Sequence, residues 1–506
     1  MLLSVALALA APDAAVVYLP EAPTTLDPLF AWSPVDQLVH SLVHERLFHP
    51  PPPARGGEPW SRLVAGWDQQ GTEARLTLGR GHRWHDGHPL DAGDVCFTVD
   101  ALVHPRTNAP SGPRARATLA SCRVDPADPL TAVLTLWGPQ DARPALSVPI
   151  VPQHAYASPA VTGDPRVQAE PVGAGPYRFV GRSEAGLHLS AAWPGLPLHD
   201  LVLAPIGDPY VDALALLHSD AAATAWVPPL ALPALRAAPD IGLHPWDRLV
   251  AWSIALDTSA PPLDDRRVRQ ALDLLLDREA LRRRLAGGDD PSRDEQPWPF
   301  VTGPFAYGSP RASQGIASPL RDVARARALL EQAGLSLDGH GQWQLPDGTP
   351  FALHLTVPTH HGVGPAGLAS HLGWQGIDVT VTAAGREEWV AGVWAGGHRG
   401  HADAVLLPRP LHPDDDPSPW LHSRTEREGW ANVFDFSDPE VDRLLALARE
   451  PGGDAAARQL HGRVADLRPH LFLFEERAWT AWRGPWRTWV PAPYDGWSRI
   501  DQWARD

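Results

Sequence analysis

The 506-residue chain contains no lysine and only two cysteines, and it carries no excess of positive charge. All 43 basic residues are arginines, and 59 acidic residues outnumber them, so that the net charge is −16. Nucleic acids and anionic membrane surfaces attract proteins through basic surface, so neither is expected as the main partner. The absence of lysine beside abundant arginine, alanine and proline is better explained by genomic base composition than by function.

An apolar run, LLSVALALAA, occupies residues 2–11 and ends in small side chains. It is too short to cross a bilayer, and Ala8-Leu9-Ala10 has the pattern of a signal-peptidase site, although no basic residue precedes the run. We therefore expect residues 1–11 to be a signal peptide of an exported protein. No cysteine follows the run directly, so no lipid anchor is expected there.

The two cysteines, Cys96 and Cys122, leave two interpretations open. They are either two small buried apolar side chains or one disulfide, which an oxidising compartment permits. The sequence does not decide between them, because it does not fix the distance between the helix that carries Cys96 and the strand that carries Cys122.

Residues 76–103 combine the signals of a strand, a turn and a helix. Apolar residues alternate at the start, and His85-Asp86-Gly87 provides turn chemistry. Asp91 stands where a helix N-cap is expected, and Asp94 lies in the first turn, where negative charge suits the helix dipole. Apolar residues then recur at helical spacing as far as Val103, which predicts an amphipathic helix.

The same segment resembles the signature of solute-binding protein family 5, whose members deliver peptides, and in some cases nickel, to ABC importers. The matching positions are Trp84, His85, Asp86, Gly87, Pro89, Leu90, Ala92, Asp94, Val95, Phe97 and Thr98. Three later segments also resemble the family: GAGPY at 173–177, PLDDRRVRQAL at 262–272 with Asp277-Arg278, and SDPEVDRLL at 437–445. The last of these predicts a capping box that opens a helix.

Apolar periodicity elsewhere predicts strands that alternate with helices, which indicates an α/β fold. Strands are expected at 131–136, 249–256, 351–357, 377–381 and 404–407, and helices at 264–285, 321–333, 367–374 and 386–395. The helix over 264–285 is expected to break near Asp277.

The resemblance implies a two-lobed periplasmic-binding-protein fold with a hinge and an inserted third subdomain. It places the first part of lobe I at 12–45, the inserted subdomain at 46–160 and the second part of lobe I at 161–248. Lobe II is expected at 249–480, and residues 481–506 return to lobe I. The chain should cross between the lobes within 246–256 and again within 478–489.

Two groups of residues are candidates for contact with a solute in the cleft that the resemblance implies. Trp32 and Ser33 follow a Leu26-Asp27-Pro28 segment like that of the family, and a tryptophan can form a flat wall of such a cleft. Asp257 stands where relatives often carry asparagine, and it is either a ligand contact or a surface acid.

The second group lies in the segment DAVLLPRPLHPDDDPSPWL, at 403–421. The segment resembles one in peptide-binding relatives. The relatives carry a tryptophan there, and an acid that pairs with the α-ammonium of the peptide. Arg409 stands at the tryptophan position and His412 at the acid position. The following acids are Asp414, Asp415 and Asp416. One of these three acids could replace the missing acid, or the loop could be a solvated acidic surface.

Other motifs have structural explanations. His82, His85 and His88 recur every third residue, but a turn would direct them apart, so no metal site is predicted. The G-x-G-x-x-G pattern at 362–367 lacks an acid at the usual distance for a dinucleotide site. Neither a hydrolase motif nor a C-x-x-C motif is present. Together with the resemblance to binding proteins, this predicts neither a cofactor nor catalysis.

The sequence thus predicts a periplasmic, monomeric substrate-binding component of an ABC importer that captures a peptide or peptide-like solute for a membrane permease. Two alternatives remain open. The solute could instead be a sugar, an opine or a metal chelate, or the fold could serve a sensor or an enzyme rather than transport.

Overall fold

The structure is a computed structural model. It describes residues 15–484 except 32, 50–58, 108, 110, 160–163, 197, 207–208, 220–221, 229–230, 287–297, 359–366, 386–387, 389–401, 412–415, 424–431 and 451. The expected signal peptide, the candidate residues Trp32, His412, Asp414 and Asp415, and most of the helix expected at 386–395 lie outside the described residues. No helix within them is long and apolar enough to span a membrane.

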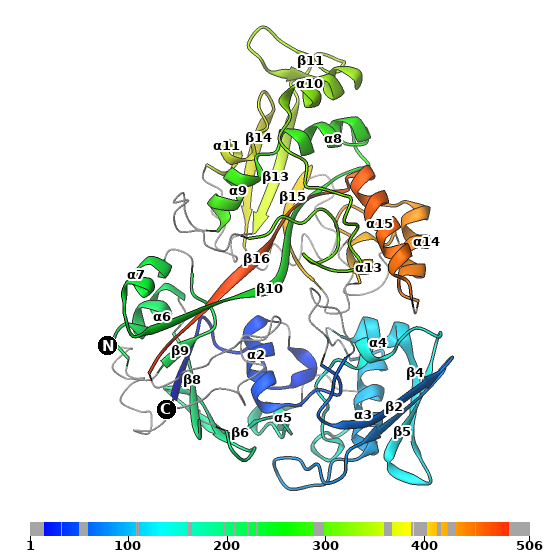
Figure 1. Ribbon diagram of the computed structural model, residues 1–506, viewed down its shortest axis with the longest axis vertical. Helices are drawn as coiled ribbons and strands as arrows, with labels where there is room; N and C mark the ends of the chain where they lie inside the picture. The colour runs from blue at the N-terminus through cyan, green and yellow to red at the C-terminus, as the bar shows by residue number, and fades with distance from the viewer. Residues whose placement is uncertain are drawn as a thin grey trace. The chain divides into compact units, whose positions relative to one another are not determined.

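The chain divides into two compact units. Among the described residues, unit 1 extends to Arg248 and resumes at Arg477, and unit 2 comprises Leu249–Glu476. Two long strands carry the chain across these boundaries, β10 (Ile241–Leu256) from unit 1 to unit 2 and β16 (His470–Arg483) back again (Figure 1).

The main sheet of unit 1 has the strand order β9-β1-β8-β7-β6. Strand β1 pairs in parallel with β8 and β9, whereas β6, β7 and β8 form antiparallel pairs. The strands are β1 (Ala15–Leu19), β6 (Tyr177–Ser183), β7 (Gly186–Ala191), β8 (Asp200–Pro205) and β9 (Ala222–Thr224). The helices are η1 (Pro28–Phe30), α2 (Pro34–Val43), α5 (Pro165–Ala169), α6 (Pro209–Leu216) and α7 (Leu232–Ala237).

Unit 1 also contains a separate four-stranded antiparallel sheet with the order β2-β3-β5-β4 and its own apolar core. Helix α3 lies against this sheet (Figure 1) and contacts β4 and β5. The elements are β2 (Val64–Gln70), β3 (Glu73–Leu78), α3 (Ala92–Val103), α4 (Gly112–Thr118), β4 (Leu119–Asp125), β5 (Asp128–Leu136), η3 (Arg143–Leu146) and η4 (Gln153–Ala155).

The strand, turn and helix predicted at 76–103 are confirmed. Asp91 is the N-cap of α3, and it forms a reciprocal capping box with Asp94. Asp94 also accepts hydrogen bonds from the indole nitrogen of Trp84, at 3.0 Å, and from the backbone nitrogen of Gln153, at 2.8 Å. The Asp94 carboxylate therefore completes the capping box and also binds two neighbouring segments at the start of the helix.

The disulfide interpretation of the cysteines is the one that the structure bears out. Cys96 in α3 and Cys122 in β4 form a disulfide, with their Cα atoms 5.0 Å apart. The bond joins the helix to the edge strand of the four-stranded sheet, and the half-cystine Cys96 is buried in the same core. It therefore restrains α3 on the sheet that it covers.

Removal of this disulfide is expected to destabilise unit 1. The bond closes a loop with a sequence separation of 26 residues, for which chain entropy predicts a loss of about 3–4 kcal/mol. The measurement is chemical unfolding of the double variant Cys96→Ala/Cys122→Ala beside the wild type, with and without reductant. Reductant should lower the wild type to the level of the variant and leave the variant unchanged, and equal stability under oxidising conditions would contradict the prediction.

Two of the family-like segments are in direct contact. His85, in the turn before α3, donates its backbone N–H to the Gly173 carbonyl at 2.8 Å, and its Nε2 lies 2.9 Å from the Gly175 carbonyl oxygen. The backbone nitrogen of Gly175 in turn donates to the Val43 carbonyl, at the end of α2. The GAGPY segment is therefore held between α2 and the turn.

Gly173 is required at this contact because a Cβ atom there would lie 1.8 Å from the Val43 carbonyl oxygen. The obstacle is backbone, which no side-chain rotation can move aside, so Gly173→Ala is expected to cost about 3 kcal/mol or more in unfolding free energy. The control is Gly181→Ala, where a Cβ would meet nothing within 4 Å and the cost should stay within about 0.5 kcal/mol. Equal urea midpoints for the two variants would refute the packing argument.

Unit 2 is built on strands in the order β14-β13-β15-β10, of which β13, β14 and β15 are parallel and β10 is antiparallel to β15. The strands are β11 (Ser336–Leu337), β12 (Trp343–Gln344), β13 (Ala352–Pro358), β14 (Asp378–Ala384) and β15 (Ala404–Pro410). The helices are α8 (Arg266–Leu275), α9 (Arg278–Leu285), α10 (Val323–Gln332), α11 (Leu368–Leu372), α13 (Ser418–Leu421), α14 (Pro439–Ala448) and α15 (Asp454–Leu467).

The helix break predicted near Asp277 is confirmed, because α8 ends at Leu275 and Asp277 is the N-cap of α9. The capping of α14 differs from the prediction by one residue. Its N-cap is Asp438, whose carboxylate accepts the backbone N–H of Val441, in place of Ser437. Pro439 then occupies N1, a position that proline favours, and Asp438 also binds Arg463 of α15.

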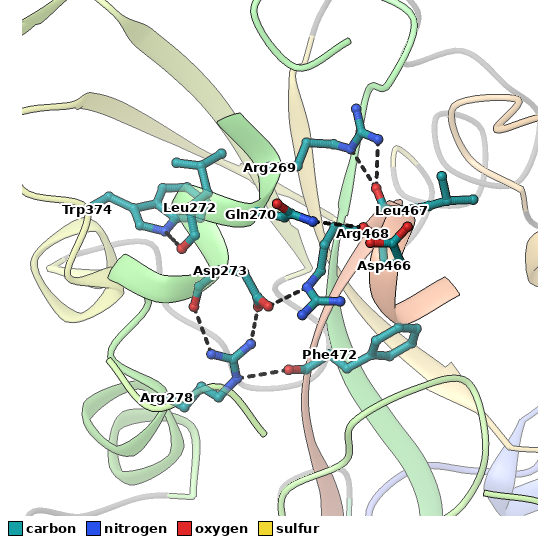
Figure 2. Close-up of polar contacts among 10 residues, drawn as sticks. All are labelled: Arg269, Gln270, Leu272, Asp273, Arg278, Trp374, Asp466, Leu467, Arg468 and Phe472. Carbon is teal, nitrogen blue, oxygen red and sulfur yellow. Dashed lines mark hydrogen bonds and ion pairs between the residues drawn. The ribbon is translucent and has the colours of Figure 1, made fainter. Parts of the chain in front are cut away.

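A buried network of arginines joins α8, α9, α15 and β16 in unit 2 (Figure 2). Asp273 of α8 pairs with Arg278 of α9, and its second carboxylate oxygen lies 2.6 Å from Arg468, the residue that follows α15. Arg278 also donates to the Phe472 carbonyl in β16, at 3.1 Å. Arg269 caps α15 by donating to the Leu467 carbonyl at 2.7 and 3.0 Å. Ion pairs and charged hydrogen bonds thereby connect three helices and a strand.

Candidate functional site

Each unit presents an edge at which parallel strands end together. In α/β sheets, ligands bind characteristically at the carboxyl ends of parallel strands, where the loops are free to contribute polar groups. In unit 1 this edge carries the loop that follows β1 and leads to Ser33. In unit 2 it carries Leu411, the residue that follows β15, whereas residues 412–415 lie outside the described residues. Of the described candidate residues, Arg409 lies next to such a strand end, as the penultimate residue of β15.

The loop after β1 is organised by the carboxylate of Asp36. Ser33 is the N-cap of α2, and Ser33 and Asp36 form a reciprocal capping box. Asp36 also accepts hydrogen bonds from the Thr24 backbone nitrogen, at 2.6 Å, and hydroxyl, at 2.7 Å. Ser33 is 2% exposed, and its described role is to cap α2 and so to position the loop. Its prediction as a ligand contact is not tested by these contacts.

Asp27 of the same loop is a buried acid that the sequence pattern did not single out as functional. Burial raises the pKa of its carboxyl group to about 6, although the backbone of Leu29 and the hydroxyl of Tyr156 both donate to it. The partner Tyr156 is 129 residues away in sequence. No local pattern could therefore have revealed the pair.

Arg409 lies inside unit 2. It is 1% exposed, in β15, and its guanidinium carbon lies 5.1 Å from the centroid of the Phe472 ring, in a cation–π arrangement. Burial lowers the pKa of His470, and the positive charge of Arg409 lowers it further. Arg409 therefore disfavours the charged form of His470, in β16.

Asp416 is engaged by its own neighbours. One of its carboxylate oxygens accepts the backbone N–H of Ser418 at 3.0 Å and the Ser418 hydroxyl at 2.6 Å, and the other lies 3.6 Å from Arg449. These contacts hold the start of α13. Of the three candidate acids, Asp416 is the one with a described structural role.

The structure does not bring Asp257 together with Arg409. Leu256 of β10 pairs with Ala404 at the start of β15, whereas Val250 pairs with Pro410 at its end. Six residues of strand separate these ends, or about 20 Å. Asp257 instead accepts hydrogen bonds from the Ser259 backbone and hydroxyl. It therefore lies at the opposite end of the β10–β15 pair from Arg409.

A hollow of about 670 Å³ lies in unit 1 beside Thr24 and Thr25. Its volume is in the range of small-molecule sites, and its lining includes Gln168, Phe179 and Arg182. Arg182 donates to the Gln168 carbonyl at 3.1 Å. Of the candidate ligand contacts that the structure describes, namely Ser33, Asp257, Arg409 and Asp416, none lines this hollow.

Comparison with known proteins relates the chain to solute binding. The family model of bacterial extracellular solute-binding proteins, family 5, matches residues 58–425. Protein XP55 of Streptomyces lividans is 30% identical over 397 residues, which cover 75% of this chain and 68% of that protein. The glutathione-binding protein GsiB of Salmonella paratyphi A is 26% identical over 497 residues, covering 90% of this chain and 86% of GsiB.

A solved structure shares the fold. The oligopeptide-binding protein AppA of Bacillus subtilis, in complex with a nonapeptide, superposes with a TM-score of 0.76 at 19% identity, over 97% of this chain and 98% of AppA. The predicted α/β, two-lobed periplasmic-binding-protein fold is thus confirmed. The chain belongs to the bacterial extracellular solute-binding proteins of family 5.

Proposed function

We propose that this chain is the substrate-binding component of an ABC importer, and that it captures a peptide or peptide-like solute and delivers it to a membrane permease. The observation that carries the proposal is the family match over residues 58–425. Similarity to GsiB over 86% of that protein, and the shared fold with a nonapeptide-bound AppA, support a peptide as the solute.

The proposed mechanism is binding without turnover. A solute that contacts one conformation better than another shifts the population toward that conformation by its difference in affinity. The permease then needs only to recognise the liganded conformation. A monomer is sufficient for this cycle, because the binding groups come from one chain.

Location outside the cytoplasm completes the proposal. The family is extracellular by description, and the Cys96–Cys122 disulfide suits an oxidising compartment such as the periplasm. Residues 1–11 would then serve as the signal peptide that directs export.

Within the proposed site, Asp414 or Asp415 is the anchor for the α-ammonium of the peptide. Both acids follow β15, whose carboxyl end lies at the candidate edge of unit 2. Asp416 already binds Ser418 and Arg449 and is therefore assigned to holding the loop. His412 and Trp32 stay proposed ligand contacts, as do Ser33 and Arg409.

Peptide binding by the wild type and three variants tests the anchor. Asp414→Asn or Asp415→Asn is expected to weaken binding of a free peptide by at least about tenfold, because a charge-assisted hydrogen bond is lost. The same variant should bind an N-acetylated peptide as weakly as the wild type does. Asp416→Asn serves as the matched control and should lower stability without changing the preference for a free amino terminus.

Two results would refute the anchor or the function. If all three variants retain wild-type affinity, no acid of this loop holds the ammonium. If no peptide mixture raises the thermal midpoint of the wild type while a sugar, opine or metal chelate does, the solute is not a peptide, since a ligand of the native state stabilises it by mass action.

A further inference from the structure

The turn before α3 presents two ligand-type side chains from a rigid hairpin. The backbone nitrogen of Trp84 donates to the His88 carbonyl at 2.9 Å, and Gly87, at φ +92°, closes the turn by donating to the Trp84 carbonyl. The Asp86 carboxylate accepts the backbone N–H of His88 at 3.1 Å. These hydrogen bonds fix the backbone of the turn that carries Asp86 and His88.

A third ligand-type side chain reaches this turn from a distant segment. His154 lies in η4, and the preceding residue, Gln153, is tied to Asp94 of α3 through its backbone nitrogen. The His154 ring packs edge-on against Trp84, with the ring centroids 6.5 Å apart. The segment is 68 residues from Asp86 in sequence, yet it is anchored to the same helix start.

The donor atoms of the three side chains converge on one point. His154 Nε2 lies 2.6 Å from one oxygen of Asp86, and His88 Nδ1 lies 3.2 Å from the other. The two imidazole rings stack with their centroids 4.1 Å apart, and one donor atom from each residue lies within 4.8 Å of the others. In a tetrahedral site with bonds of about 2.1 Å, ligand atoms are about 3.4 Å apart, so small side-chain rotations suffice.

The donor set selects the type of ion. Two imidazole nitrogens and one carboxylate oxygen suit zinc and neighbouring transition metals, whereas magnesium and calcium prefer oxygen ligands. The exposed fractions of the His88 and His154 side chains are 59% and 31%, so an ion can enter from solvent. Water can occupy a fourth coordination position.

We propose that Asp86, His88 and His154 form a binding site for a divalent transition-metal ion, with zinc as the reference ion. The ion would link the turn before α3 to the segment around η4 within unit 1. The neighbouring histidine does not take part, because His85 Nε2 is directed to the Gly175 carbonyl. None of the candidate solute-binding residues belongs to this site, and the proposal does not depend on which solute the protein binds.

Zinc titration of the full-length, chelator-treated protein, followed by isothermal calorimetry at about pH 7.5, tests the site. The wild type should bind one zinc ion at this site. His88→Gln, Asp86→Asn and His154→Gln should each weaken that binding by at least about tenfold. His82→Gln, in the same hairpin but outside the cluster, is the matched control and should bind zinc as the wild type does.

Cobalt provides a second readout that a structural role alone would not produce. Cobalt bound by the wild type should give the visible absorption of a four-coordinate nitrogen and oxygen site, and His88→Gln should lose it. An absence of zinc binding by the wild type would overturn the proposal. Equal affinities of the wild type and His88→Gln would also overturn it, as would an equal loss in His82→Gln.

Discussion

Asp273→Asn is expected to destabilise unit 2 by about 3–5 kcal/mol, because it leaves a buried arginine without its counter-charge. The Asp273 and Arg278 side chains are 3% and 6% exposed, so water cannot replace the lost carboxylate. Arg468 loses a partner at 2.6 Å through the same change. The measurement is the free energy of unfolding from a urea transition monitored by tryptophan fluorescence.

The matched control is a surface ion pair of the same unit. Arg327 and Glu331 lie one helical turn apart in α10, and their side chains are 58% and 51% exposed. Glu331→Gln should change the free energy of unfolding by less than about 1 kcal/mol, since exposed ion pairs contribute little. If Asp273→Asn costs no more than Glu331→Gln, the network of Figure 2 does not hold the helices of unit 2 together.

Acidification from pH 6.5 to 4 is expected to destabilise the protein by several kcal/mol, since unfolding releases buried histidines that can then bind protons. Burial lowers the pKa of His40 to about 4 and that of His44 well below its usual value, and burial with the charge of Arg409 lowers that of His470 to about 3. In the unfolded chain these rings bind protons near pH 6.5, so their contribution is complete above that pH and is lost below it. Asp27 opposes them, because burial raises its pKa to about 6.

His470→Gln isolates one of these histidines. His470 Nδ1 lies 3.2 Å from the Ser253 hydroxyl, and an amide can replace this hydrogen bond without titrating. The slope of unfolding free energy against pH between 4 and 6.5 should fall by about 1.4 kcal/mol per pH unit, the value for one proton. A His470→Gln profile parallel to that of the wild type would contradict the assignment.

Local signals explain why much of the fold was predictable from the sequence. Asp91 precedes an apolar helical pattern and supplies a side-chain oxygen, so the start of α3 was located correctly. Asp277 caps α9 at the helix break that was predicted near it. The strand at β13 was evident because apolar residues alternate along it. The N-cap of α14 was misplaced by one residue although a local signal was present, because Pro439 occupies N1, the position that proline favours, and Asp438 precedes it.

Contacts between distant segments explain what could not be predicted. The disulfide partner of Cys96 lies in β4, and only the packing of α3 on the sheet brings the two cysteines together. His154 joins Asp86 and His88 for the same kind of reason, whereas the three histidines of the turn diverge as the local geometry requires. The candidate solute residues are the part of the prediction that still depends on resemblance.

Native mass spectrometry of the full-length protein tests the central claim most directly. The protein would be incubated with an equimolar mixture of short peptides, sugars, opines and metal chelates, and the mass of the bound species would be read from the complex. The account predicts one peptide bound per chain, in a saturable manner and with no chemical change in the peptide. A complex with a non-peptide solute alone, or conversion of the peptide into a product, would contradict it.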